Sequence, residues 1–215
     1  MPLNELIPKA IRLWPKKEAI VCGDIRLSYN ELGKRIFSLC NVLKKLGLKK
    51  GNRLAIFHEN CHRFLEAYFA AAHLGIILVP INIRLSINEL CLIIEDSGAS
   101  IIISQDKFMD RIEELATKTG IKEIIYTGSS KKGNGLDYEK LLQESEPIIP
   151  SIDIKGSDIA QIYYTSGTTG RPKGVMLTHK NVKAHALGTI AELHLTDKDN
   201  WIHAAPMFHL ADAWA

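Results

Sequence analysis

The chain has 215 residues, of which 46% are hydrophobic, and its formal net charge is only +3. These values are typical of a globular protein and exclude collagen-like, disordered and coiled-coil chains. Because the positive charge is weak and evenly spread, it does not indicate a nucleic-acid or membrane surface, and we expect a small molecule as the partner.

The N-terminal residues bear on the compartment of the protein. Glu5 and Pro8 interrupt this segment, which lacks the apolar stretch of a secretory signal. The most apolar run, residues 67–81, is broken by a histidine, a glycine and a proline, and it is shorter than the roughly 20 residues of a spanning helix. We therefore expect a cytoplasmic protein without a transmembrane segment, whose cysteines are free thiols: Cys22, Cys40, Cys61 and Cys91.

The first 50 residues predict two helices around a hairpin. Apolar residues at helical spacing and paired β-rich runs carry this prediction. The expected elements are a helix over residues 3–11 closed by Pro15, a hairpin over 19–27, and a helix that the Ser28–Glu31 capping box opens and Gly47 ends.

Strands and helices alternate from residue 53 onward. Short, continuous β-rich runs predict strands at 53–57, 76–79, 100–103, 123–126 and 159–164, and helical patterns lie at 61–74, 87–97 and 106–118. Ser86 with Glu89 forms a second capping box, and Gly75, Gly98 and Gly120 occupy expected helix ends. The segment between the last two strands is expected to be irregular. This alternation predicts an α/β fold with a mostly parallel sheet and flanking helices.

The segment from Thr165 to Gly174 carries the strongest chemical signal. It follows an apolar strand and packs four hydroxyls, three glycines and two cations before the next apolar run. Such a loop offers backbone N–H groups, hydroxyls and positive charge to a polyphosphate. It is neither the Walker pattern nor G-x-G-x-x-G. The alternative is a flexible surface hairpin, which its position after a buried strand disfavours.

Four motifs resemble those of the adenylate-forming superfamily, which includes the acyl-CoA synthetases. They are Y-T-S-G-T-T-G-R-P-K-G-V from Tyr164, L-S-Y-N-E-L from Leu27, the G-x-x-x-V-P-x-N element that begins at Gly75, and P-M-F-H from Pro206. The resemblance implies the first part of the family's large N-terminal domain. It also implies three parts of the chain. Residues 1–50 would pack on a second subdomain, residues 51–200 would form an α/β phosphate-binding subdomain, and residues 201–215 would begin the second subdomain.

The resemblance also implies a reaction and roles for individual residues. A carboxylate would attack the α-phosphate of ATP to give an acyl-adenylate, and coenzyme A would then displace AMP. Thr165 would also touch Mg²⁺, and His209 would orient the carboxylate and α-phosphate without abstracting a proton. The phosphates that leave as pyrophosphate would be held by Thr165, Ser166, Gly167, Thr168, Thr169, Gly170 and Lys173.

Later family motifs, for adenine, ribose and the adenylation lysine, are absent from the sequence. We therefore expect the N-terminal part of an acid–CoA ligase, acting on a carboxylic acid, with a fatty acid as the expected substrate, and inactive as the 215-residue chain alone. Two alternatives stay open: a non-catalytic phosphate- or nucleotide-binding module, and an adenylation enzyme that loads a carrier-protein thiol. Cys61 begins a helix, and no residue in the sequence pattern would activate its thiol.

Overall fold

A computed structural model describes residues 2–128, 133–165 and 171–210. The N-terminal part contains two helices around a two-stranded antiparallel hairpin, as predicted. Its elements are the short 3-10 helix η1 (Leu3–Glu5), α1 (Leu6–Leu13), β1 (Glu18–Cys22), β2 (Ile25–Ser28) and α2 (Tyr29–Lys45).

The second sheet has seven strands in the order β7-β6-β5-β3-β4-β8-β9. Its pairs are parallel from β7 to β8, and β9 joins β8 antiparallel at the edge. The predicted α/β fold with a mostly parallel sheet is therefore confirmed. The strands are β3 (Arg53–Phe57), β4 (Ile77–Pro80), β5 (Ile101–Gln105), β6 (Glu123–Thr127), β7 (Leu136–Asp137), β8 (Ile159–Thr165) and β9 (Lys173–Thr178).

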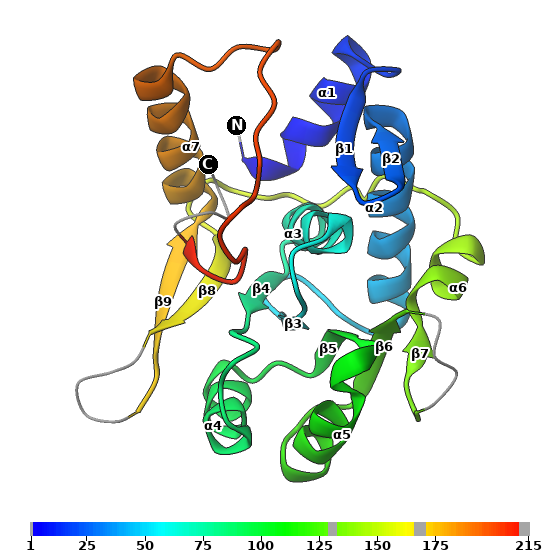
Figure 1. Ribbon diagram of the computed structural model, residues 1–215, viewed down its shortest axis with the longest axis vertical. Coiled ribbons are helices and arrows are strands. Elements are labelled where there is room, and N and C mark those ends of the chain that lie inside the picture. Colours follow the sequence, from blue (N-terminus) through cyan, green and yellow to red (C-terminus); the bar gives the residue numbers. More distant parts are fainter. Residues whose placement is uncertain (1, 129–132, 166–170, 211–215) are drawn as a thin grey trace.

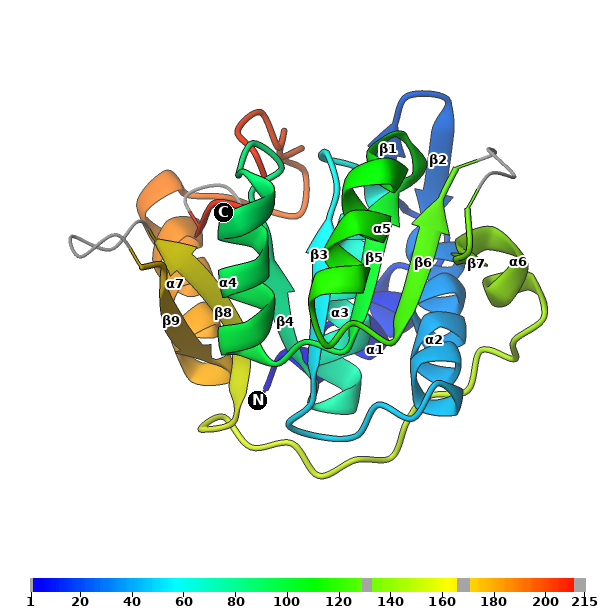
Figure 2. The same cartoon turned by 90° about the horizontal axis from the view of Figure 1, so that it is seen from below.

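Helices cover both faces of this sheet. In Figures 1 and 2, α1, α2 and α3 lie on one face, and α4 and α5 lie on the other. Alternate residues of β3 point to opposite faces: Leu54 and Ile56 join one core cluster, and Ala55 and Phe57 join the other. Burial on both faces explains the unbroken apolar run of this strand. The remaining helices are α3 (His62–Leu74), α4 (Ile87–Ser97), η2 (Asp106–Phe108), α5 (Met109–Lys118), α6 (Tyr138–Gln143) and α7 (His179–Leu193).

Helix ends follow the sequence signals with one exception. Both predicted capping boxes form, at Ser28 before α2 and at Ser86 before α4. Gly75 and Gly98 end α3 and α4 in the left-handed region, at φ values of 63° and 64°. The prediction for Gly120 is wrong, because α5 ends at Lys118 and its C-cap, Thr119, is extended.

The segment between β6 and β8 is more regular than expected. It contains β7 and α6, and the side chain of Asp137 caps α6 by accepting a hydrogen bond from the backbone N–H of Lys140, 2.8 Å away. With two residues in β7 and six in α6, neither element is long enough to show a hydrophobic period. Residues 144–158 are irregular, as predicted.

A partly buried ion network joins α2, α3 and α6. The Arg35 guanidinium contacts the Glu66 carboxylate at 2.6 Å and the Glu139 carboxylate at 2.8 Å. Arg63 also reaches Glu139, at 2.7 Å, and the Tyr138 hydroxyl donates to Glu66 at 2.6 Å. The side chain of Glu66 is 0% exposed, so its charge depends on these partners.

The N-terminal elements share a core with the sheet. Ile7, Ile20 and Leu32 belong to the same buried cluster as Leu54 and Ile56. The expected contact of residues 1–50 with a second subdomain, and the boundaries at residues 50 and 200, stay predictions. In the described ranges, no helix combines the length and the apolar composition that crossing a bilayer requires.

Candidate functional site

The predicted phosphate loop joins β8 to β9. Thr165 is the last residue of β8, and Lys173, the first of β9, is its partner across the antiparallel pair. Both residues are exposed, and within the described ranges neither side chain makes a hydrogen bond or an ion pair. Both side chains are therefore exposed where the two strands meet the loop. The predicted contacts Ser166, Gly167, Thr168, Thr169 and Gly170 lie outside the described residues.

Close packing explains one glycine next to this loop. A Cβ atom on Gly174 would lie 2.8 Å from Cγ2 of Ile162 and 3.1 Å from Cζ of Tyr164. Tyr164 is itself held from the other side, because its hydroxyl donates to Asp96 at 2.5 Å. The strand that leads into Thr165 is therefore fixed against both β9 and α4.

The fold places a second set of residues at the carboxyl ends of the parallel strands. The helices that follow β3 and β5, α3 and α5, lie on opposite faces of the sheet (Figures 1 and 2). Open α/β sheets bind ligands at this kind of topological switch, beyond the carboxyl ends of the strands. The loop of residues 58–61 leaves β3 there, and it carries Asn60.

The segment that carries His209 has no strand and only its last described residue, Leu210, is helical. Met207 and Phe208 are buried, at 2% and 5% exposure, whereas His209 is exposed. The backbone N–H of His209 donates to the carbonyl of Pro206 at 2.9 Å, and its ring meets Phe208 edge-on at 4.7 Å between centroids. Two buried neighbours thus hold an exposed imidazole at the surface.

Asn60 holds this segment through its carboxamide. Its Nδ2 donates to the carbonyl oxygens of His203, at 3.1 Å, and Ala205, at 2.7 Å. Its Oδ1 accepts from the backbone N–H of Met207 at 2.7 Å. One side chain from the loop after β3 therefore binds three backbone groups of the segment.

Tyr68, on α3, holds the same segment from a second direction. Its hydroxyl donates to the carbonyl of Met207 at 2.9 Å and lies 2.6 Å from the hydroxyl of Tyr163 on β8. A hydroxyl has one proton to donate, and a carbonyl can only accept, so Tyr163 is the donor to Tyr68. Both rings are buried, at 1% and 5% exposure.

These ties connect the two predicted parts of the site indirectly. Tyr163 precedes Thr165 by two residues on β8, and Met207 precedes His209 by two residues. Among the described residues, no hydrogen bond or ion pair joins Thr165 or Lys173 to His209. The outer end of β8 and β9 extends away from the rest of the sheet in both views (Figures 1 and 2). Asn60, Tyr68 and Tyr163 were not found from the sequence. A polar residue soon after a buried strand, as at Asn60, was the available signal.

Cys61 has a partner that the sequence did not reveal. His58 Nδ1 lies 2.7 Å from the carbonyl of Glu59 and 3.5 Å from Cys61 Sγ, and His58 Nε2 lies 2.6 Å from Thr127 Oγ1. The carbonyl requires a proton on Nδ1, so Nε2 accepts from Thr127. Burial lowers the pKa of His58 to about 4 and raises the pKa of Cys61 to about 11. The thiol is therefore protonated at neutral pH, which does not suit a nucleophile.

Among the described residues of the predicted site, the Thr165 hydroxyl is the candidate ligand for a divalent cation. In these ranges, no three His, Cys, Asp or Glu side chains gather as a metal site. Mg²⁺ usually keeps several waters and binds through substrate phosphates and one or two protein oxygens. The exposed hydroxyl of Thr165 fits one such contact to an ion that arrives with a nucleotide.

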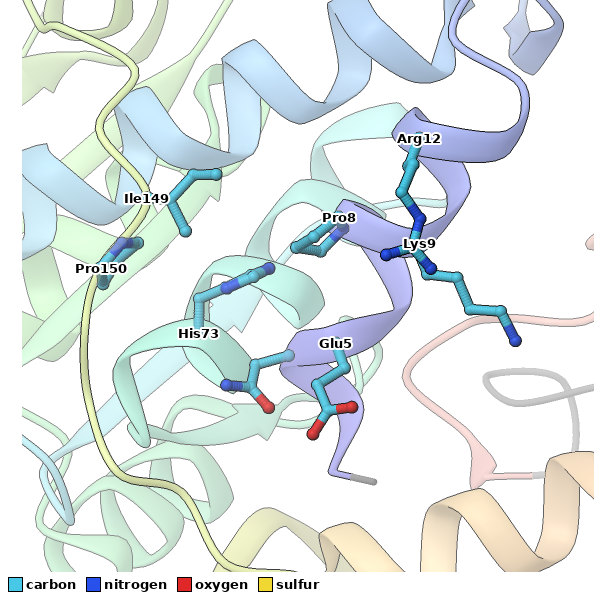
Figure 3. Close-up of a pocket in the computed structure, with 8 residues that line it drawn as sticks. Glu5, Pro8, Lys9, Arg12, His73, Ile149 and Pro150 are labelled. Atoms are coloured by element: carbon cyan, nitrogen blue, oxygen red, sulfur yellow. The ribbon is translucent and has the colours of Figure 1, made fainter.

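A separate hollow of about 400 Å³ lies near the N-terminus (Figure 3). His73 lines it from the last turn of α3, opposite Pro8 of α1 and opposite Ile149 and Pro150 in the irregular segment of residues 144–158. His73 Nε2 is buried and has no hydrogen-bond partner in the described part of the chain, and burial lowers the pKa of this histidine to about 4. Because α3 runs back from the carboxyl end of β3 to the amino end of β4, this hollow lies away from the predicted site residues.

Comparison with known proteins gives consistent matches. The profile of the family described as AMP-binding enzyme matches residues 7–215. The feruloyl-CoA synthase of Amycolatopsis sp. is 34% identical over 93% of this chain and 38% of that protein. The crotonobetaine/carnitine–CoA ligase of Escherichia coli K12 is 30% identical over 90% of this chain and 40% of that protein. The chain thus spans about two fifths of the length of these relatives.

Two solved structures are similar along almost the whole chain. The inhibitor-bound N-terminal domain of FACL13 from Mycobacterium tuberculosis gives a TM-score of 0.90 at 28% identity, over 99% of this chain and 53% of that one. A fatty acyl CoA synthetase from the same organism gives a TM-score of 0.82 at 26% identity, over 99% of this chain and 41% of that one.

Proposed function

The chain belongs to the AMP-binding enzyme family, and on this premise we propose that it forms part of an ATP-dependent carboxylic acid–CoA ligase. In the first half of the proposed reaction, a carboxylate oxygen attacks the α-phosphate of ATP and pyrophosphate leaves. In the second half, the thiol of coenzyme A attacks the acyl carbonyl and AMP leaves.

The placement of Thr165 and Lys173 is the observation that carries the proposal. They face each other where a buried strand ends and an edge strand begins, and neither side chain has a partner within the described ranges. The ammonium group of Lys173 neutralises charge on the β- and γ-phosphates, and the hydroxyl of Thr165 donates to a phosphate oxygen. Both groups stabilise the pyrophosphate as it leaves.

We assign His209 a positioning and charge-stabilising role. Its imidazole is exposed beside buried Phe208, so it is accessible to a substrate but fixed at its base. A carboxylate is already a nucleophile and needs no general base. His209 therefore donates a hydrogen bond to the reacting carboxylate or α-phosphate rather than removing a proton.

Mg²⁺ would neutralise part of the negative charge of the phosphates and so reduce their repulsion of the incoming carboxylate. Thr165 is the described residue that we propose as its contact. Waters and phosphate oxygens of the nucleotide would supply its other ligands.

The acid is proposed at two levels. A carboxylic acid is the broader proposal, and a fatty acid is the finer one. The relatives are named for feruloyl and for crotonobetaine or carnitine substrates, and one similar structure is of a fatty acyl CoA synthetase. A panel of aromatic, short polar and long aliphatic acids in an ATP–pyrophosphate exchange assay tests both levels.

The exchange assay compares the 215-residue chain with a longer protein that contains it. We expect acid-dependent exchange from the longer protein and none from the 215-residue chain. Absence of exchange with every acid would refute the ligase proposal. Thioester formation with a carrier protein, and none with coenzyme A, would favour the carrier-loading alternative.

Lys173→Ala tests the phosphate contact directly. We expect the KM for ATP to rise about 10-fold or more, with a smaller change in the KM for the acid, because one charged contact to phosphate is lost. Lys180→Ala is the matched control, since it removes an exposed lysine from the first turn of α7. An unchanged dependence on ATP in Lys173→Ala would contradict the proposed contact.

A further inference from the structure

We propose that Asn60 and Tyr68 are positioning residues that clamp the backbone on both sides of Met207 and thereby set the position of His209. This inference rests on the proposed function for its catalytic consequence. The clamp itself is a property of the chain and can be tested without activity.

The carboxamide of Asn60 is chemically specific for its three partners. Its two N–H donors face the carbonyls of His203 and Ala205, and its oxygen faces the N–H of Met207. An aspartate keeps the acceptor but loses both donors, and an alanine loses all three bonds. The three bonds can therefore form together only when residues 203–207 adopt one particular backbone conformation.

Tyr68 closes the clamp on the other side of the same residue. The N–H of Met207 is held by Asn60 and its C=O by Tyr68, at 2.7 Å and 2.9 Å. Both main-chain polar groups of Met207 are held by hydrogen bonds. Because His209 follows Met207 by two residues, these bonds restrict where its imidazole can lie. The segment's own backbone bonds from Ala204 to Ile202 and from His209 to Pro206 are short-range, whereas Asn60 and Tyr68 tie it to distant parts of the chain.

Tyr163 extends the clamp to the phosphate loop. It donates to the Tyr68 hydroxyl at 2.6 Å and lies on the strand that ends at Thr165. A displacement of β8 along its axis would stretch this bond, whose acceptor is the same hydroxyl that binds Met207. The hydroxyl pair thus links the loop that holds phosphate to the segment that holds the imidazole.

Hydrogen–deuterium exchange in the 215-residue chain tests the clamp. In Asn60→Ala, we expect the Met207 amide to exchange at least about 10-fold faster, because its acceptor is gone. Asn60→Asp should leave this amide more protected than Asn60→Ala, because a carboxylate oxygen still accepts. Asn41→Ala is the matched control: it removes a side-chain bond to the Glu146 carbonyl and should leave residues 203–209 unchanged.

A double-mutant cycle in the longer protein tests the consequence for catalysis. We expect kcat for exchange to fall about 10- to 100-fold in Asn60→Ala, with the KM for ATP changed less than about 3-fold. Combining Asn60→Ala with His209→Ala should cost little more than His209→Ala alone, because the clamp acts through the imidazole. Additive losses would overturn the positioning role.

The two arms separate failure of the inference from failure of the proposed function. If the unmodified longer protein shows no exchange, the ligase proposal fails while the Met207 amide still decides the clamp. Unchanged exchange of this amide in Asn60→Ala would overturn the clamp whatever the activity. If Asn60→Ala does not fold, Asn60→Leu replaces it, because leucine keeps the volume of the side chain but makes none of the three bonds. Met207 amide protection equal to that of the unmodified chain would then overturn the inference.

Discussion

The Arg35–Glu66 pair gives the most quantitative prediction. Arg35→Met keeps the aliphatic stem but removes the guanidinium, which makes two bonds to Glu66 and two to Glu139. Glu66 is 0% exposed, so its carboxylate would stay buried with the Tyr138 hydroxyl as its remaining described partner. Breaking a buried pair in this way costs about 3–5 kcal/mol of unfolding free energy. In a chain of this size, the melting temperature should fall by about 6–20 °C.

The loss of unfolding free energy in Arg35→Met should depend on pH and should be larger at neutral than at acidic pH. Burial raises the pKa of Glu66, and Arg35 opposes this rise. Without Arg35, the pKa in the folded state rises further above the value of about 4.3 in the unfolded chain. A carboxyl group with a raised folded-state pKa favours folding when protonated, so the variant loses stability as pH rises above about 4.3. The difference between the unmodified chain and Arg35→Met should therefore shrink as pH is lowered toward that value.

Urea unfolding, followed by tryptophan fluorescence at several pH values, measures these free energies. Arg26→Met is the control, because the Arg26–Glu18 pair is 65% and 49% exposed and should contribute less than about 1 kcal/mol. Adding Glu66→Gln to Arg35→Met removes the buried charge but keeps an oxygen for Tyr138, and it should recover at least half of the loss. A loss no larger than that of Arg26→Met, or no recovery in the double variant, would refute the reasoning.

Three further predictions concern stability. Burial lowers the pKa of His58 and of His73 to about 4, whereas the unfolded value is about 6.5. Because each imidazole is buried in its neutral form, it lowers the free energy of unfolding by up to about 3 kcal/mol as pH falls from about 6.5 to 4. In urea titrations at pH 7 and pH 4, His73→Leu should therefore lose less stability between the two pH values than the unmodified chain. Gly174→Ala should cost about 1–3 kcal/mol, because the new methyl group meets Cγ2 of Ile162 at 2.8 Å; a neutral result in thermal unfolding would mean that β9 shifts freely. Ser86→Ala should cost about 1 kcal/mol through loss of the α4 capping box, and faster amide exchange in the first turn of that helix is the local measurement.

The sheet and its helices could be predicted because their signals are local. The run from Leu54 to Phe57 is apolar throughout since both faces of β3 are buried. Ser28 and Ser86 cap their helices through residues three positions away. β7 and α6 were missed because they are short. α5 ends at Lys118, as its periodicity predicts, but the extended residue Thr119 follows it and Gly120 does not cap it in the left-handed region.

The site was predictable only where a motif marks it. Thr165, Lys173 and His209 were named from their motifs, and their roles stay predictions. Asn60 escaped because its partners lie 143–147 residues away along the chain. No periodicity or composition signal connects residues at that separation; only the packing of the segment over the carboxyl end of β3 brings them together.

The antiparallel edge of the sheet has a consequence for handling the protein. β9 is the last strand in the described sheet, and its Val175 and Met176 are 44% and 61% exposed. An edge strand with free backbone donors and acceptors and apolar side chains is a template for pairing with another strand. We therefore expect β9 to be a site of self-association in the purified chain, and a charged residue in place of Met176 should raise the concentration at which it begins.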